Sequence, residues 1–156
     1  GKSTIGRLLA KKLNTKFIDV DKLIEKQEKK SIKRIFETNG EDYFRKIETG
    51  ITLKVLKIKK SVIALGGGAF MNSEIRREVQ KNCVSFWLNL KIGQLLKRYK
   101  RNNRRPLLVS TDLENDVKRI LVVRKKIYAQ ANFKVNCDNK DKKEIVQKIL
   151  KLNEKN

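Results

Sequence analysis

The sequence begins with four residues that together could bind phosphate. Gly1, Lys2, Ser3 and Thr4 match the second half of the pattern G-x-x-x-x-G-K-[ST], which binds nucleotide phosphates between a strand and a helix. In this pattern the glycine lets backbone N–H groups approach phosphate oxygens, the lysine reaches the β- and γ-phosphates, and the hydroxyl binds Mg²⁺. We therefore expect a nucleotide site here, with Lys2 as a catalytic cation and Ser3 as a magnesium ligand.

Two carboxylates follow in residues 16–21 (KFIDVD). We expect a short strand ending in Asp19 and Asp21, whose side chains at i and i+2 would share one face. Ligands bind at the carboxyl edge of a parallel sheet, so one acid could support Mg²⁺ while the other accepts a proton from a hydroxyl group. Asp21 could instead cap the helix that begins at Lys22.

Three consecutive glycines, Gly66, Gly67 and Gly68, follow the apolar residues VIAL. Glycine costs chain entropy on folding, but its backbone can approach a ligand closely. A tight turn from strand to helix rarely needs three glycines. We therefore expect a turn that contacts a ligand.

Arg124 interrupts an apolar helical stripe. The other members of the stripe are Val117, Ile120, Leu121 and Tyr128. A charge on an apolar face needs a partner, so Arg124 either points into a cleft toward an anion or extends to the edge of its helix. Arg45 is less informative, because Glu48 at i+3 offers a plain surface ion pair.

One loop, at about residues 100–111, is rich in basic residues and contains Arg104, Arg105 and the only proline, Pro106. Basic residues in a long loop suit a lid over transferring phosphates. A solvated turn would explain the same composition.

Segments with helical and strand-like patterns alternate along the chain and must position these residues. We expect a helix after residue 4, a mostly helical segment at 22–60 broken near residues 39–40, a buried strand entering the glycines, and three later helices. Further strands are expected at residues 83–88 and 133–137, with a last helix near 145–150. This order predicts one domain over residues 1–156, with a three-layer α/β/α fold and a parallel sheet.

The strand that normally precedes a phosphate loop lies inside the sheet. Without it, buried backbone groups lose partners at roughly 1–3 kcal/mol each, and a cleft remains in the core. We therefore expect the first strand to be missing from this chain. The natural product would carry about ten more residues upstream, an apolar strand and the first half of the loop.

The chain has a formal net charge of +22, which could indicate a nucleic-acid partner. However, lysines lie in every segment between acidic residues, and Lys, Asn and Ile all have A/T-rich codons. Biased codon usage therefore explains the charge better than a specific nucleic-acid surface. No apolar run has the length of a membrane span and the start is not a signal peptide, so we expect a cytoplasmic protein without a membrane partner.

These motifs together resemble the shikimate kinase family over essentially the whole chain. GKSTIGRLLA resembles the phosphate loop and first helix of the family, FIDVD its acidic strand end, and SIKRIFETNGEDYFRKIE its substrate-binding segment. ALGGGAF, RRPLL and RKKIY are similar to the glycine turn, the lid motif and a second substrate-binding arginine. The resemblance implies a phosphate-loop fold like that of nucleoside monophosphate kinases.

The resemblance also implies a role for each matching residue. Asp19 would support Mg²⁺, while Asp21 would bind the ring hydroxyls of shikimate. Asp21 would also be the base, because the chain has no histidine. Arg45 and Arg124 would hold the shikimate carboxylate beside the glycine turn.

On the nucleotide side, the resemblance places Arg98 near adenine and gives Arg105 contacts with substrate and phosphates. The implied reaction moves the γ-phosphoryl group of ATP to the 3-hydroxyl of shikimate, a step of chorismate and aromatic amino-acid biosynthesis. We expect a monomer that binds ATP, Mg²⁺ and shikimate. Alternatives are another small-metabolite or nucleotide kinase of the same fold, or a basic nucleic-acid-binding module without catalysis.

Overall fold

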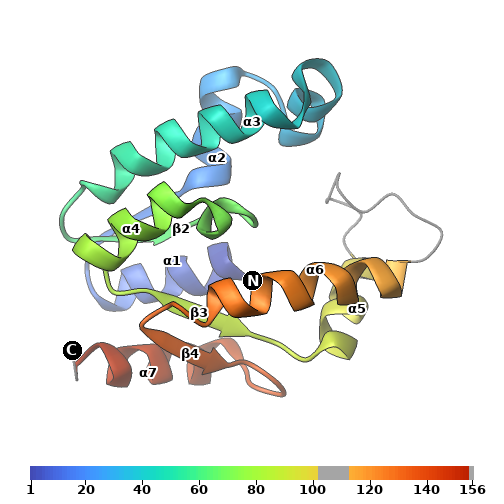
Figure 1. Cartoon of the computed structure of the whole chain (residues 1–156). Helices are drawn as coiled ribbons and strands as arrows, with labels where there is room; N and C mark the ends of the chain where they lie inside the picture. The colour runs from blue at the N-terminus through green and yellow to red at the C-terminus, as the bar shows by residue number, and fades with distance from the viewer. Residues whose placement is uncertain (102–112, 155–156) are drawn as a thin grey trace.

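The computed structural model describes residues 1–101 and 113–154 of the 156-residue chain. Helices and strands alternate along it (Figure 1). In chain order they are α1 (Lys2–Lys12), β1 (Lys16–Asp19), α2 (Val20–Glu28), α3 (Ile32–Leu56), β2 (Ser61–Ala64), the short 3-10 helix η1 (Ala69–Met71), α4 (Ser73–Asn82), β3 (Phe86–Asn89), α5 (Ile92–Arg101), α6 (Leu113–Tyr128), β4 (Phe133–Asn136) and α7 (Lys142–Asn153). No described helix is long and apolar enough to cross a membrane.

The described strands form two parallel pairs. β1 pairs with β2 in the register Lys16 to Ser61, and β3 pairs with β4 in the register Phe86 to Phe133. Parallel neighbours require a crossover through a helix, which is the order that the alternating sequence pattern predicted. The predicted parallel α/β arrangement is therefore confirmed.

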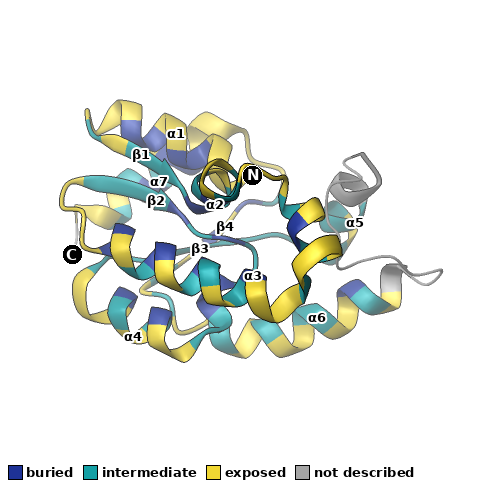
Figure 2. Ribbon diagram, turned by 90° about the horizontal axis from the view of Figure 1, so that it is seen from above, coloured by how far each residue is buried: buried dark blue, intermediate teal, exposed yellow. Residues whose placement is uncertain are grey.

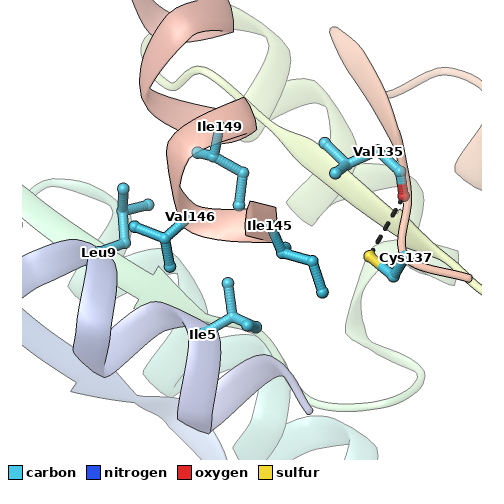
Figure 3. Close-up of a cluster of buried hydrophobic side chains, with 7 residues drawn as sticks. All are labelled: Ile5, Leu9, Val135, Cys137, Ile145, Val146 and Ile149. Carbon is cyan, nitrogen blue, oxygen red and sulfur yellow. Dashed lines mark hydrogen bonds between the residues drawn. The ribbon is translucent and has the colours of Figure 1, made fainter. Parts of the chain in front are cut away.

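Helices cover both faces of the strands (Figure 2). On one face, α1 and α7 pack over β4, and their buried side chains form the cluster drawn in Figure 3: Ile5, Leu9, Val135, Cys137, Ile145, Val146 and Ile149. On the other face, α3 packs against α2 and α4 through two further apolar clusters. Burial of these apolar stripes is the main source of stability in such a layered fold.

The segment after β1 differs from the sequence prediction. The strand ends at Asp19, which caps α2 by accepting a hydrogen bond from the N–H of Lys22 at 3.3 Å. Asp21 therefore lies in the first turn of a helix, so the strand spacing expected for the two acids was wrong. The helical segment expected at residues 22–60 is also interrupted earlier, at Lys29 (φ 51°), before Ser31 caps α3.

The break expected near residues 39–40 is a kink within α3 at Gly40. Its backbone angles, φ 81° and ψ 175°, lie in a region that is essentially restricted to glycine. The kink separates the start of α3 from the part that carries Arg45.

The structure contains a large open cavity of about 2710 Å³. Residues of β2 and of β3 line it, although these two strands belong to different pairs. The cavity extends to the N-terminal turn of α1, so it connects the expected nucleotide site with the carboxyl ends of the strands.

Candidate active site

The first turn of α1 borders the cavity through Gly1, Lys2, Ser3 and Thr4. All four residues are exposed, and the carbonyl of Gly1 accepts the first helical hydrogen bond, from the N–H of Ile5 at 3.0 Å. The N-terminus of a helix attracts anions through its unsatisfied N–H groups and its dipole. The structure therefore places these residues where a phosphate group could reach them.

Both predicted acids line the same cavity. Asp19 and Asp21 are half-buried and flank the junction between β1 and α2. The capping role that the sequence analysis offered as an alternative for Asp21 belongs to Asp19 instead. The side chain of Asp21 reaches toward the glycine turn, since a Cβ placed on Gly66 would lie 2.9 Å from Asp21 Oδ1.

Arg45 also lies at the cavity and is held by two acids from its own helix. Its Nη1 donates to Glu48 Oε2 at 2.6 Å, while Nε and Nη2 donate to Glu41 Oε1 at 3.1 and 3.0 Å. Its guanidinium group also lies over the ring of Phe44, 5.3 Å from the centroid. Burial acts to lower the pKa of Arg45, but Glu48 and Glu41 raise it overall, so the side chain stays cationic.

Glu48 is a site residue that the sequence analysis missed. It was expected to form a plain surface ion pair with Arg45, but its relative exposure is only 2%. Burial raises the pKa of Glu48, as does the charge of Asp21, whereas Arg45 and Arg124 act to lower it. The i+3 spacing from Arg45 predicted the ion pair correctly, but no local pattern indicated that the glycine turn lies against the pair.

The glycine turn passes very close to these charged side chains. A Cβ on Gly66 would collide with Glu48 Oε1, and one on Gly68 would lie 2.7 Å from Arg45 Nη1. A side chain at either position would therefore displace Glu48 or Arg45 from its place beside the turn. The turn brings backbone groups directly against Arg45, Glu48 and Asp21.

Arg124 reaches the same turn from α6. Its Nη1 donates to the carbonyl oxygen of Gly67 at 2.9 Å, and the hydroxyl of Tyr128, one helical turn later, donates to the same oxygen at 2.7 Å. The sequence analysis offered a cleft or the helix edge for Arg124, and the structure places it at the cavity. Tyr128 was assigned only to the apolar stripe, and its contact with the turn was not foreseen.

Two predicted residues are not placed at the site by the structure. Arg105, in the basic loop, lies outside the described residues. Arg98 belongs to α5, but its side chain is likewise outside the described part of the chain.

The residues expected to hold Mg²⁺ could supply only part of its ligand shell. Among the described residues, no group of three or more His, Cys, Asp or Glu side chains could hold a metal ion. Mg²⁺ usually takes one or two protein oxygens and completes its shell with water and substrate phosphates. The hydroxyl of Ser3 and the carboxylate of Asp19, which line one cavity, provide oxygen donors of this kind.

Comparison with known proteins identifies the family. The sequence model described as shikimate kinase matches residues 1–154. The chain belongs to the shikimate kinase family. It is therefore an ATP-dependent kinase, and the sequence-based prediction of family and fold is confirmed. The shikimate kinase of Persephonella marina is 40% identical over 150 residues, which cover 96% of this chain and 90% of the relative.

Solved shikimate kinases share the fold closely. A shikimate kinase from Acinetobacter baumannii, solved in complex with shikimate, superposes with a TM-score of 0.93 at 32% identity, over 97% of this chain and 86% of that one. A shikimate kinase from Bacteroides thetaiotaomicron gives a TM-score of 0.90 at 30% identity, over 99% and 92% of the two chains. The described helices and strands of this chain therefore have the same arrangement as in these solved shikimate kinases.

Proposed function

We propose that this kinase transfers the γ-phosphoryl group of ATP to the 3-hydroxyl of shikimate. The observation that carries the proposal is the convergence of Asp21, Arg45 and Arg124 on one glycine turn, in the cavity that the first turn of α1 also borders. The Acinetobacter relative, which binds shikimate, supports the choice of acceptor.

Charge explains how the acceptor would be held. Shikimate carries one carboxylate, and a guanidinium group can bind a carboxylate through two parallel hydrogen bonds. Arg45 and Arg124 approach the turn from different helices, α3 and α6, so the substrate carboxylate would be held from two directions. Backbone groups of Gly66, Gly67 and Gly68 would complete this site.

Asp21 would bind and orient the ring hydroxyls and accept the proton of the attacking one. A carboxylate is the appropriate base in a chain without histidine. Orienting the hydroxyl toward the phosphate is as important as removing its proton, because positioning supplies much of the rate in phosphoryl transfer.

On the nucleotide side, Gly1, Lys2, Ser3 and Thr4 would bind the ATP phosphates, with Lys2 neutralising the charge that develops during transfer. Mg²⁺ would be held by Ser3 and supported by Asp19, and would supply further neutralisation when bound. Arg98 near adenine and Arg105 over the phosphates belong to the proposal on the family resemblance alone.

The same proposal treats residues 1–156 as one kinase domain, with a lid at about residues 100–111. It describes a cytoplasmic monomer with ATP and shikimate as its partners. Size-exclusion chromatography with light scattering would test the monomeric state.

A coupled assay of ADP release, with and without shikimate, tests the reaction. We expect ADP release to depend on shikimate, and Asp21→Asn to lower kcat by at least about 100-fold while the far-UV circular dichroism spectrum is unchanged. Asp42→Asn, an exposed change of the same kind on α3, is the control and should leave kcat unaltered. ADP release that ignores shikimate would contradict the proposed acceptor, and near-normal turnover of Asp21→Asn would contradict the role of Asp21.

A further inference from the structure

Tyr128 lies at the end of α6, between the glycine turn and the sheet. Its hydroxyl donates to the carbonyl oxygen of Gly67 at 2.7 Å. Its ring packs against Phe70 on η1, with centroids 6.3 Å apart, and meets the edge of Trp87 on β3 at 6.1 Å. These aromatic contacts fix the ring, so the hydroxyl is presented to Gly67 in a defined position.

The middle of the glycine turn has few other constraints. A Cβ on Gly67 would meet nothing within 4 Å, whereas the flanking glycines touch Glu48, Asp21 and Arg45. The open space beside Gly67 leaves room for the Gly67–Gly68 peptide to rotate. The hydrogen bonds from Tyr128 and Arg124 to the Gly67 carbonyl oxygen oppose such a rotation.

The orientation of this carbonyl matters for an anionic ligand. In a trans peptide the N–H group points opposite to the carbonyl oxygen. With the oxygen of Gly67 directed at α6, the N–H of Gly68 points away from α6. A rotated peptide would turn the carbonyl dipole toward the ligand, and an oxygen repels a carboxylate.

We infer that Tyr128 is a positioning residue for substrate binding, which holds the Gly67 carbonyl away from the substrate carboxylate and keeps Arg124 aligned. This inference rests on the proposed function, because it assumes that the glycine turn receives shikimate. Tyr128 does not itself touch the substrate in this account. It acts through the carbonyl oxygen of Gly67, which accepts one hydrogen bond from Tyr128 and another from Arg124.

The test is Tyr128→Phe, which removes the hydroxyl and retains the ring. Trp87 is the only tryptophan in the chain and lines the cavity, so its fluorescence can report a shikimate titration. We expect the Kd for shikimate to rise roughly three- to tenfold, as for the loss of one hydrogen bond, while the KM for ATP stays within about twofold. Trp87 emission without ligand should be unchanged, since the aromatic contact remains.

Tyr43→Phe is the matched control. Tyr43 is an exposed residue of α3, and its hydroxyl donates to Glu28 Oε2 at 2.9 Å. Tyr43→Phe therefore also removes one tyrosine hydroxyl and its hydrogen bond, but not at the glycine turn. This variant should bind shikimate like the wild type.

Two other results would overturn the inference alone. The first is an unchanged Kd for shikimate in Tyr128→Phe. The second is an equal weakening of shikimate and ATP binding together with a lowered Tm, which indicates a merely structural role. A wild-type chain that gives no shikimate response would instead overturn the proposed function on which the inference rests.

Discussion

At the scale of residues, the site is a cluster of positively and negatively charged side chains around the glycine turn at residues 66–68. Arg45 and Glu48 form an ion pair with N···O 2.6 Å, and Glu48 is the more deeply buried partner. Three acids, Asp21, Glu41 and Glu48, lie near the two arginines Arg45 and Arg124. Burial raises the pKa of Glu48, so the stability of the fold should depend on pH through this group.

Glu48→Gln tests this through stability. A carboxyl group whose pKa is raised on folding contributes stability that is fully present below its unfolded pKa and lost as pH rises through the folded value. We expect the free energy of unfolding of the wild type to fall, relative to Glu48→Gln, as pH rises above 4.5, the ordinary pKa of the group. Urea unfolding at a series of pH values measures the difference, with Glu41→Gln as the exposed control. A difference that rises with pH would show that Arg45 outweighs burial.

Arg124→Ala tests the second cation. Loss of a charged donor to the substrate carboxylate should raise the Kd for shikimate roughly 10- to 100-fold, with a much smaller effect on ATP. Arg119→Ala, an exposed change on the same helix, should alter neither value. Isothermal titration with each ligand separates the two effects, and equal losses would mean that Arg124 has only a structural role.

At the scale of elements, the sequence predicted the order of helices and strands well but not the contacts between them. Apolar periodicity located α1, α3 and the strands because it reflects burial directly. It missed the break between α2 and α3. There Lys29 adopts a left-handed backbone conformation, and no glycine or proline marks the position in the sequence. It also missed the burial of Glu48 and the hydroxyl contact of Tyr128, because both depend on a turn that is distant in the sequence.

The kink in α3 gives a prediction at this scale. Gly40→Ala should lower the free energy of unfolding by about 1–3 kcal/mol, because alanine is strained at φ 81° although its Cβ would meet no atom within 4 Å. Gly50→Ala lies in the regular part of the same helix with equal space around it, and should raise stability by roughly 0.5–1 kcal/mol. Chemical denaturation of both variants provides the comparison. A stable Gly40→Ala variant would indicate that the kink straightens at little cost.

At the scale of the whole molecule, positive charge dominates, with 39 Lys and Arg against 17 Asp and Glu. Mutual repulsion of like charges opposes the compact state. The ion pairs identified among the described residues are mostly exposed i+3 or i+4 pairs, which contribute little stability. The net charge is therefore a cost to stability that the fold tolerates.

Screening should relieve this cost. We expect Tm to rise as NaCl increases from about 10 to about 150 mM, because the Debye length falls to about 8 Å at that ionic strength. Differential scanning calorimetry with NaCl and NaF at equal ionic strength would distinguish screening from specific binding of the anion, which is the ion that a cationic protein attracts. A Tm that falls with salt would show that favourable ion pairs outweigh the repulsion.

The net positive charge also predicts how the chain binds nucleic acid. We expect weak binding of a labelled RNA at low salt that disappears near physiological salt, which is the behaviour of generic electrostatic attraction. Fluorescence anisotropy over a salt series measures it. Tight binding that persists at physiological salt would support the alternative of a nucleic-acid-binding module.

The excess of positive charge has a further consequence for concentrated solutions. At low salt, like-charged copies repel one another and stay apart. Added salt would then protect the individual molecule from heat while bringing copies close enough to aggregate, so solubility and thermal stability should respond to salt in opposite directions.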